Sequence, residues 1–257
     1  NERSVYYSHF EEIKNLQAKT LVPNGKSYKT FKVKDFYSKN DVSSGVFFDD
    51  QKAINWTFTD LAPGARTILS YQEIQSEPRF FGLFFFGSYI DTREVEFSVN
   101  VPDGITIKYK LFNVAEGSVE FTEKAVGKGK IYSWKAKNVK KYSSEDGAPN
   151  IRYYAPHIVI YVDEFTVGKE KKKLLGTPED LYKWYSTLVK DVNTKEDPSL
   201  KHIVDSLIQG DNDEFSKVKK IFYWVQDHIK YVAFEDGLGG FVPREAAVVC
   251  SRRFGDC

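Results

Sequence analysis

The sequence predicts an α+β protein, in which an N-terminal antiparallel β-sandwich-like domain is followed by a helical segment that opens a second domain. Before about residue 168, polar and apolar residues alternate and turn residues recur. Beyond residue 175, apolar residues return at steps of three and four, as on one face of a helix. A length of 257 residues suits two domains. We therefore expect a β-rich domain over residues 1–168 and a helical part over residues 169–257.

The clearest β pattern lies in residues 94–111. Strict alternation runs through residues 94–101 and resumes at residues 105–111. Between them, Pro102, Asp103 and Gly104 are residue types that turns favour. We predict an antiparallel hairpin that turns at residues 102–104. One buried face would carry Val95, Phe97, Val99, Ile105, Ile107 and Tyr109.

Further short strands are expected at residues 56–58, 67–71, 131–136 and 158–162, separated by glycine- and proline-containing turns. Many short strands without intervening helices are typical of a β-sandwich or a related antiparallel fold. A phenylalanine-rich stretch is interpreted as core or as a seam between domains, with an exposed binding patch as the alternative. It contains Phe80, Phe81, Phe84, Phe85 and Phe86.

Four helices are expected in the last third of the chain. Thr177 is the N-cap of the first, and Pro178 is its first helical residue. The second begins near Pro198 and ends at Gly210, and the fourth begins at residues 243–245 and carries Cys250.

The third helix has the strongest apolar stripe. We predict that Phe222, Val225 and Ile229 are buried on its inner face. The opposite face is expected to be exposed and carries Lys219, Lys220, Gln226 and Lys230.

Composition excludes several classes of partner. The net charge of +1 indicates neither a nucleic-acid-binding nor an anionic-membrane-binding protein. No apolar stretch reaches the roughly 20 residues that a transmembrane helix needs. The lysine-rich run at residues 169–173 is interpreted as a solvated linker.

The end of the chain carries the candidate chemistry. A cysteine acts as a nucleophile in its thiolate form, which a helix N-terminus or a neighbouring imidazolium favours. Gly255 and Asp256 suit a tight turn just before Cys257, with Asp256 orienting that turn or, as we favour, capping a helix. The plain alternative is an ordinary thiol. Cys250 is interpreted as a small buried residue on the fourth helix.

The tail resembles the bacterial transglutaminase-like superfamily. Four segments carry the resemblance, in order and at suitable spacing: residues 222–231 (FYWVQDHIKY), 234–237 (FEDG), 239–243 (GGFVP) and 253–257 (RFGDC). Residues 1 to about 165 resemble the β-rich domain of unknown function that commonly precedes such domains. Their matching features are residues 55–58 (NWTF), Pro63-Gly64, Tyr71, residues 99–102 (VNVP), residues 132–134 (YSW) and Asn138.

The resemblance implies a papain-like cysteine hydrolase or acyltransferase, most plausibly a peptidase acting on peptide or protein substrates. Cys257 takes the position of the catalytic nucleophile, which would form a thioester on a substrate carbonyl. The family's histidine base and its aspartate or asparagine follow the cysteine. We therefore expect a chain cut off at Cys257, with its first strands also missing, and inactive without those partners. The resemblance also suggests an extracytoplasmic location, periplasmic or secreted, and no cofactor.

Glycines near the tail have two interpretations. Gly239 and Gly240 belong to a glycine-rich loop that in the family lies near the active-site cleft, so they are candidate rim residues. With Gly237 they could also cradle a phosphate, but a turn is favoured because no strand-to-helix phosphate loop surrounds them.

The histidines suggest neither a base nor a metal site. We expect His228 and His202 to be exposed on helices, and His157 and His9 to be structural. Four scattered histidines and two cysteines seven residues apart do not match zinc-ligand spacing, so no metal is expected.

Two other functions stay open. The β-domain could be a non-catalytic binding or assembly module with the helices as its scaffold, or the cysteine domain could have lost activity and serve in protein interaction. Hydrolysis and transamidation both remain possible, because water access to the thioester decides between them.

Overall fold

The computed structural model describes residues 2–42, 46–143 and 145–256. Contacts divide the chain into two compact units. The first unit joins Asn1–Ser76 with Trp184–Cys257, and the second is Glu77–Lys183. The α1 helix (Pro178–Val189) spans the boundary between them.

The second unit contains two antiparallel sheets. One has the strand order β11 (Val119–Val126), β12 (Gly129–Val139), β9 (Thr92–Val101). The other has the order β10 (Ile105–Phe112), β13 (His157–Val167), β14 (Glu170–Lys173), and β8 (Leu83–Phe85) also pairs with β13. Two short 3-10 helices, η1 (Pro78–Phe80) and η2 (Ile151–Tyr153), lie in the connections.

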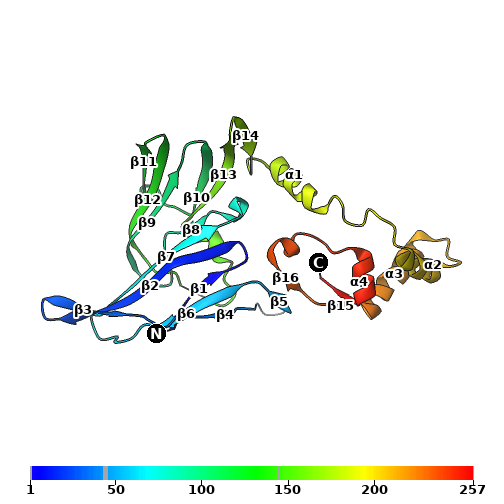
Figure 1. The fold of residues 1–257 in the computed structure, drawn as a ribbon, viewed down its shortest axis with the longest axis horizontal. Coiled ribbons are helices and arrows are strands. Elements are labelled where there is room, and N and C mark those ends of the chain that lie inside the picture. The colour runs from blue at the N-terminus through cyan, green and yellow to red at the C-terminus, as the bar shows by residue number, and fades with distance from the viewer. Residues whose placement is uncertain (1, 43–45, 144, 257) are drawn as a thin grey trace. The chain divides into compact units, whose positions relative to one another are not determined.

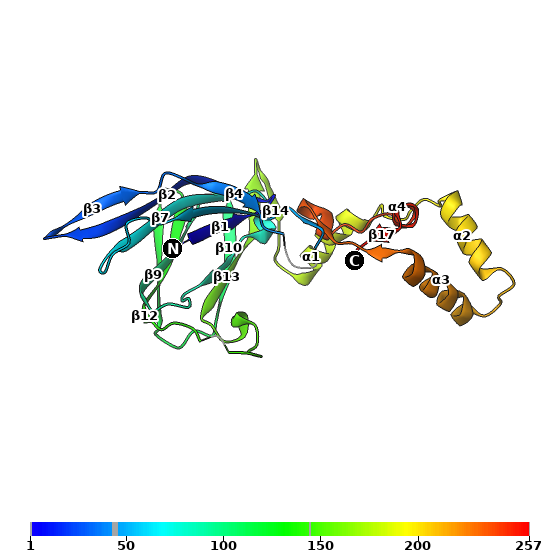
Figure 2. The same cartoon turned by 90° about the horizontal axis from the view of Figure 1, so that it is seen from below.

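The two sheets pack face to face, as Figures 1 and 2 show for the green strands. Trp134 of β12 and Ile158 and Ile160 of β13 are fully buried in one cluster with Phe86. Burying a side chain of this size stabilises a fold by about 1.5–3 kcal/mol. The predicted strands at residues 131–136 and 158–162 are therefore the centre of a sandwich core. Within the phenylalanine-rich stretch, Phe84 packs on the same cluster.

The predicted hairpin at residues 94–112 is wrong in its pairing. Both strands and the turn are present, since the Ile105 amide donates to the Pro102 carbonyl at 3.3 Å and Gly104 has a φ of +80°. However, β9 pairs with β12 whereas β10 pairs with β13, so the turn connects the two sheets. Period-two alternation identifies a strand but not its neighbour. Of the predicted face residues, Ile105 and Tyr109 are exposed, while the other four are half-buried.

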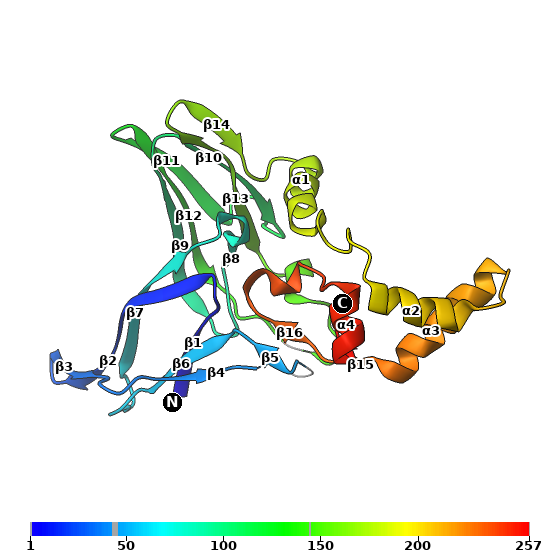
Figure 3. The same ribbon diagram turned by 45° about the vertical axis from the view of Figure 1, so that its right-hand side comes forward.

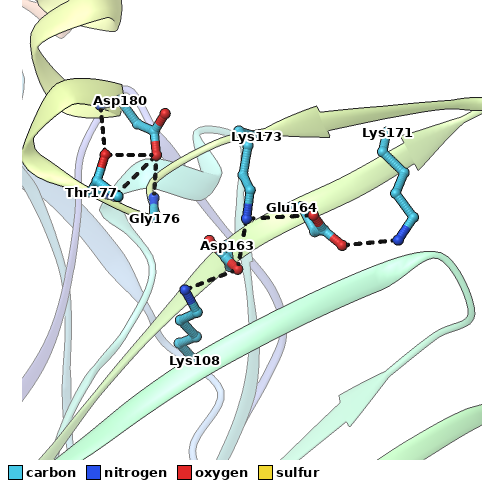
Figure 4. A network of polar contacts seen from close by, with 8 residues as sticks. All are labelled: Lys108, Asp163, Glu164, Lys171, Lys173, Gly176, Thr177 and Asp180. Carbon is cyan, nitrogen blue, oxygen red and sulfur yellow. Dashed lines mark hydrogen bonds and ion pairs between the residues drawn. The ribbon is translucent and has the colours of Figure 1, made fainter.

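A polar network fastens β14 to the sandwich (Figure 4). Asp163 on β13 is 4% exposed, and its Oδ2 lies 3.2 Å from Nζ of Lys108 and 3.1 Å from Nζ of Lys173. Next to it, Glu164 pairs with Lys171 at 3.3 Å. Burial raises the pKa of Asp163, but the hydrogen bonds from Lys173 and Lys108 outweigh it and hold that pKa below its ordinary value.

The start of α1 confirms the predicted cap. The Asp180 amide donates to the Thr177 hydroxyl at 3.3 Å, and the Asp180 carboxylate accepts from the Thr177 amide at 3.0 Å. This reciprocal pair is a capping box, and Pro178 is the first helical residue as predicted.

The β part of the first unit also has two antiparallel sheets. One runs β1 (Glu2–Tyr7), β6 (Lys52–Thr57), β4 (Tyr37–Asn40), and the other β3 (Ser27–Lys32), β2 (Glu11–Asn24), β7 (Arg66–Gln75). Their shared core contains Val5, Ala18, Trp56 and Phe58.

Three further helices belong to the first unit: α2 (Pro198–Ile208), α3 (Glu214–His228) and α4 (Ala246–Arg252). Figure 2 shows α2 and α3 as a helical hairpin, and α2 also contacts α4. Asp197 caps α2 and Asp213 caps α3, each by accepting a backbone N–H of the first turn. Among the described residues, no helix is long and apolar enough to cross a membrane.

The predicted inner face of α3 is wrong for two of its three residues. Phe222 is 56% exposed and Val225 is 44% exposed, whereas Ile229 is half-buried. The apolar stripe exists, but Phe215 and Val218 are exposed as well, so among the described residues no element covers this face. The four residues predicted to be exposed, Lys219, Lys220, Gln226 and Lys230, are exposed.

Candidate functional site

The end of the chain is held by two short parallel strand pairs. β17 (Phe254–Gly255) pairs with β15 (Lys230–Tyr231), and β16 (Phe234–Glu235) pairs with β5 (Phe48–Asp49). Figure 3 shows β15 and β16 following α3, with β5 along β16. Residues 254–256 therefore have a defined backbone position, next to the segment that follows α3.

Asp256 is the central polar residue of this region. One carboxylate oxygen accepts a 2.9 Å hydrogen bond from the Phe234 amide, and the other pairs with the guanidinium of Arg244. The side chain is 13% exposed, so these bonds are largely shielded from water. Asp256 therefore connects β16 to the segment that precedes α4. A helix that it caps would begin at Cys257, outside the described residues, so the expected cap stays a prediction.

Aromatic rings support the same contacts. The Arg244 guanidinium lies over the Phe234 ring at 5.7 Å, and the Phe254 ring stacks on Phe234 at 6.3 Å. A guanidinium over an aromatic face is attracted by the ring quadrupole. Asp256 and Phe234 thus hold Arg244 from two sides.

The predicted tight turn is not formed at Gly255. Gly255 is a buried strand residue whose carbonyl accepts a 2.9 Å hydrogen bond from the Val232 amide. The chain reverses two residues earlier, at Arg253, which ends α4 in the left-handed region with a φ of +62°. A Cβ on Gly255 would lie 3.0 Å from a methyl group of Val249, so a larger residue here would have to displace that side chain by a few tenths of an ångström.

The predicted nucleophile, Cys257, lies outside the described residues. Cys250 is buried at 8% exposure on α4 and is a free thiol, which confirms its interpretation as a small core residue.

The glycine-rich loop forms a 3-10 helix, η3 (Gly237–Gly240), which confirms the turn interpretation. Gly239 and Gly240 are exposed, and a Cβ on either would meet open space. The loop follows β16 directly, so the Phe234–Asp256 bond links it to the residue before Cys257. The assignment of Gly239 and Gly240 to the rim of the active-site cleft stays a prediction.

Three histidines lie where they were expected. His228 and His202 are exposed, and the ring of His228 stacks on Trp224. His157 is buried between the rings of Phe85 and Phe112, with Nδ1 2.9 Å from the Ala155 carbonyl. None of these three contacts Asp256.

His9 was not expected to be near chemistry, yet it lies with Asp50 and Asp236 in one cluster. Sequence patterns could not reveal this cluster, because the three residues are far apart along the chain and share no motif. The pairing of β5 with β16 brings the two aspartates together, and the His9 amide donates to Asp50.

A family described as a domain of unknown function with solved structure, DUF3857, matches residues 1–143, and the chain belongs to it. A solved structure of a putative protease from Parabacteroides distasonis ATCC 8503 is 17% identical and superimposes with a TM-score of 0.70. The match covers 99% of this chain and 48% of that protein, so the chain spans about half its length. The similarity establishes the fold. No curated protein matches.

Proposed function

We propose that this chain is the β-rich domain and the first helical part of a transglutaminase-like, papain-type cysteine hydrolase or acyltransferase, with Cys257 as its nucleophile. The observation that carries the proposal is the fixed backbone before the thiol. Gly255 pairs with Tyr231, and Asp256 is bound to Phe234 and Arg244. A nucleophile needs such positioning, because misplacement of about 1 Å can cost a hundredfold in rate. The fold shared with a putative protease supports the same class.

In the proposed reaction, the Cys257 thiolate attacks the carbonyl carbon of an amide bond. A C–S bond forms, the C–N bond breaks, and the thiol proton passes through a histidine to the departing amine. Water or a second amine then attacks the thioester and releases the cysteine. We propose that this histidine and its aspartate or asparagine partner belong to polypeptide beyond residue 257, as the resemblance implies. None of the described histidines contacts Asp256.

The two parts of the chain on either side of the predicted boundary at residue 168 would have different roles. Residues 169–257 would carry the chemistry, and residues 1–168 would form the preceding β-domain. The glycines of η3, Gly239 and Gly240, would border the substrate cleft, with a peptide or protein as the substrate. An extracytoplasmic location belongs to the same proposal.

The thiol pKa tests the assignment. Alkylation of Cys257 by iodoacetamide is measured from pH 5 to pH 10 in residues 1–257 and in the protein extended beyond residue 257, with mass spectrometry to locate the label. In residues 1–257 the terminal carboxylate adds negative charge beside the sulfur, so the thiol should react as an ordinary one, with a pKa of about 8.5 or above. In the extended protein it should react much faster near neutral pH, because an imidazolium favours the thiolate.

Cys250 is the internal control, and it should react slowly in both proteins because it is buried. Cys257→Ala should abolish amide hydrolysis by the extended protein. Equal and ordinary pKa values for Cys257 in both proteins would reject the catalytic assignment.

The alternative is a binding or assembly module. One observation favours it: a hollow of about 460 Å³ opens at one end of the second unit, between the β9–β10 and β11–β12 turns. Its lining combines three lysines with Asp103, Glu164 and Tyr132, so it would suit a polar segment such as a peptide. An extended protein that binds a peptide without cleaving it would support this alternative.

A further inference from the structure

The cluster of His9, Asp50 and Asp236 brings metal-ligating atoms together from three parts of the first unit. His9 lies in the turn between β1 and β2, Asp50 follows β5, and Asp236 lies between β16 and η3. One ligand atom of each side chain lies within 4.8 Å of the others. His9 and Asp236 are exposed and Asp50 is half-buried, so the cluster is open to solvent.

Backbone contacts hold the three residues in place. Asp50 Oδ2 accepts a 2.8 Å hydrogen bond from the Gly237 amide and a 3.3 Å bond from the His9 amide. The parallel pairing of β5 with β16 fixes the two acidic residues relative to one another. The His9 ring also lies against Gly237, where a Cβ would be 3.3 Å from the imidazole. The ligand set is therefore arranged before any ion arrives.

The side chains themselves are not paired with one another. Among the residues that the structure describes, no ion pair joins the His9 imidazole to either carboxylate, and Asp236 does not cap η3 with its side chain. Two carboxylates this close repel each other, and a cation between them relieves the repulsion. The imidazole, the Asp236 carboxylate and the second carboxylate oxygen of Asp50 are thus available to bind a metal, while Asp50 Oδ2 is held by the two backbone amides.

We propose that His9, Asp50 and Asp236 bind a divalent transition-metal ion, with Zn²⁺ as the favoured occupant. Imidazole with carboxylates suits Zn²⁺ better than Mg²⁺ or Ca²⁺, which prefer oxygen ligands alone. Two carboxylates balance the charge of the ion. Zn–N and Zn–O distances of about 2.0–2.2 Å place tetrahedral ligands about 3.5 Å apart. The three ligand atoms, which lie within 4.8 Å of one another, would therefore move closer together around the ion, and water would fill the remaining positions.

The site would join the start of the chain to the loop before the nucleophile. Asp236 follows β16, and the Phe234 amide of β16 binds Asp256. A bound ion would therefore hold the β16–η3 loop against β1 and β5. The proposal stands independently of the cysteine chemistry, because none of its ligands is a thiol.

Calorimetric titration of tag-free protein with Zn²⁺ tests the site. We expect one equivalent bound, a higher melting temperature, and no response to Mg²⁺. His9→Ala and Asp236→Asn should each weaken binding by about tenfold or more, since even outer-shell changes at metal sites cost ten- to hundredfold. The matched controls are His202→Ala and Asp60→Asn, which change exposed residues outside the cluster and should bind as the unaltered protein does.

Thiols are the competing ligands, so Cys257→Ser is titrated in parallel and should retain full binding. Circular dichroism verifies that each variant is folded, which is expected for the exposed His9 and Asp236. Titration with Co²⁺ adds a second readout, because a thiolate-free site lacks the sulfur charge-transfer band. Absence of Zn²⁺ binding, or binding lost in Cys257→Ser but kept in His9→Ala, would overturn the proposal.

Discussion

Asp256 accepts a 2.9 Å hydrogen bond from the backbone amide of Phe234, 22 residues earlier in the chain. The contact connects the residue before the proposed nucleophile to the strand that leads into the glycine-rich loop. Arg244 binds the other carboxylate oxygen and lies over the Phe234 ring. The Asp256 side chain therefore connects three segments: β17, β16 and the segment before α4.

Replacing Asp256 by Ala should destabilise the first unit by about 1–3 kcal/mol, because the Phe234 amide would lose its acceptor in a largely shielded position. Asp256→Asn should cost less, since its amide oxygen can still accept that bond while the charge facing Arg244 is lost. Urea denaturation measures both. Equal losses in the two variants would mean that the ion pair, and not the backbone hydrogen bond, carries the contact.

Two glycines that precede the proposed nucleophile should respond differently to alanine. A Cβ on Gly255 would approach Val249 to 3.0 Å, whereas one on Gly239 meets open space. Overpacking of this kind typically costs about 1–3 kcal/mol, so Gly255→Ala should lower stability and Gly239→Ala should be nearly neutral. Thermal unfolding followed by circular dichroism makes the comparison. A large loss for Gly239→Ala would show that the exposed loop is more constrained than its surroundings indicate.

Local patterns predicted the elements well. Alternation located β9, β10, β12 and β13, and the Thr177 and Pro178 signals located the start of α1, because both depend on neighbouring residues alone. Pairing was not predictable in the same way. Turn chemistry at residues 102–104 is the same whether a turn joins neighbouring strands or crosses between sheets.

In the candidate site, too, the local pattern was predictable and the long-range contacts were not. The motif identified Gly255 and Asp256 as residues of interest. It did not predict that Asp256 binds Phe234 and Arg244, or that Gly255 is a strand residue. Those relationships depend on long-range packing. The cluster of His9, Asp50 and Asp236 was missed for that reason too, since Asp50 and Gly237 are 187 residues apart and yet hydrogen-bonded.

Because Phe222 on α3 is exposed, we expect its replacement to have little effect on stability, whereas the periodicity alone predicts a large effect. A core phenylalanine replaced by alanine costs about 3–5 kcal/mol, but Phe222 is 56% exposed. Phe222→Ala should therefore change the stability of residues 1–257 by less than about 1 kcal/mol, as surface substitutions do. Ile158→Ala, at a fully buried position, should cost about 2–5 kcal/mol in the same urea assay. A loss for Phe222→Ala as large as that for Ile158→Ala would show that this face is covered in solution.

The Asp163 network predicts a stability change confined to acid. Burial raises the pKa of Asp163, but Lys173 and Lys108 outweigh it, so its folded-state pKa lies below the ordinary 3.8. A carboxylate with a lowered pKa stabilises the fold fully above its unfolded value and loses that contribution as the pH falls through the folded one. The stability difference between the unaltered protein and Asp163→Asn should thus be constant above about pH 5 and shrink below about pH 4. Urea unfolding at a series of pH values measures it, with Asp103→Asn, in the exposed β9–β10 turn, as the matched control. The control should follow the unaltered protein throughout, whereas a difference for Asp163→Asn that persists unchanged to pH 2 would mean that shape, and not the charge facing the two lysines, fixes this residue.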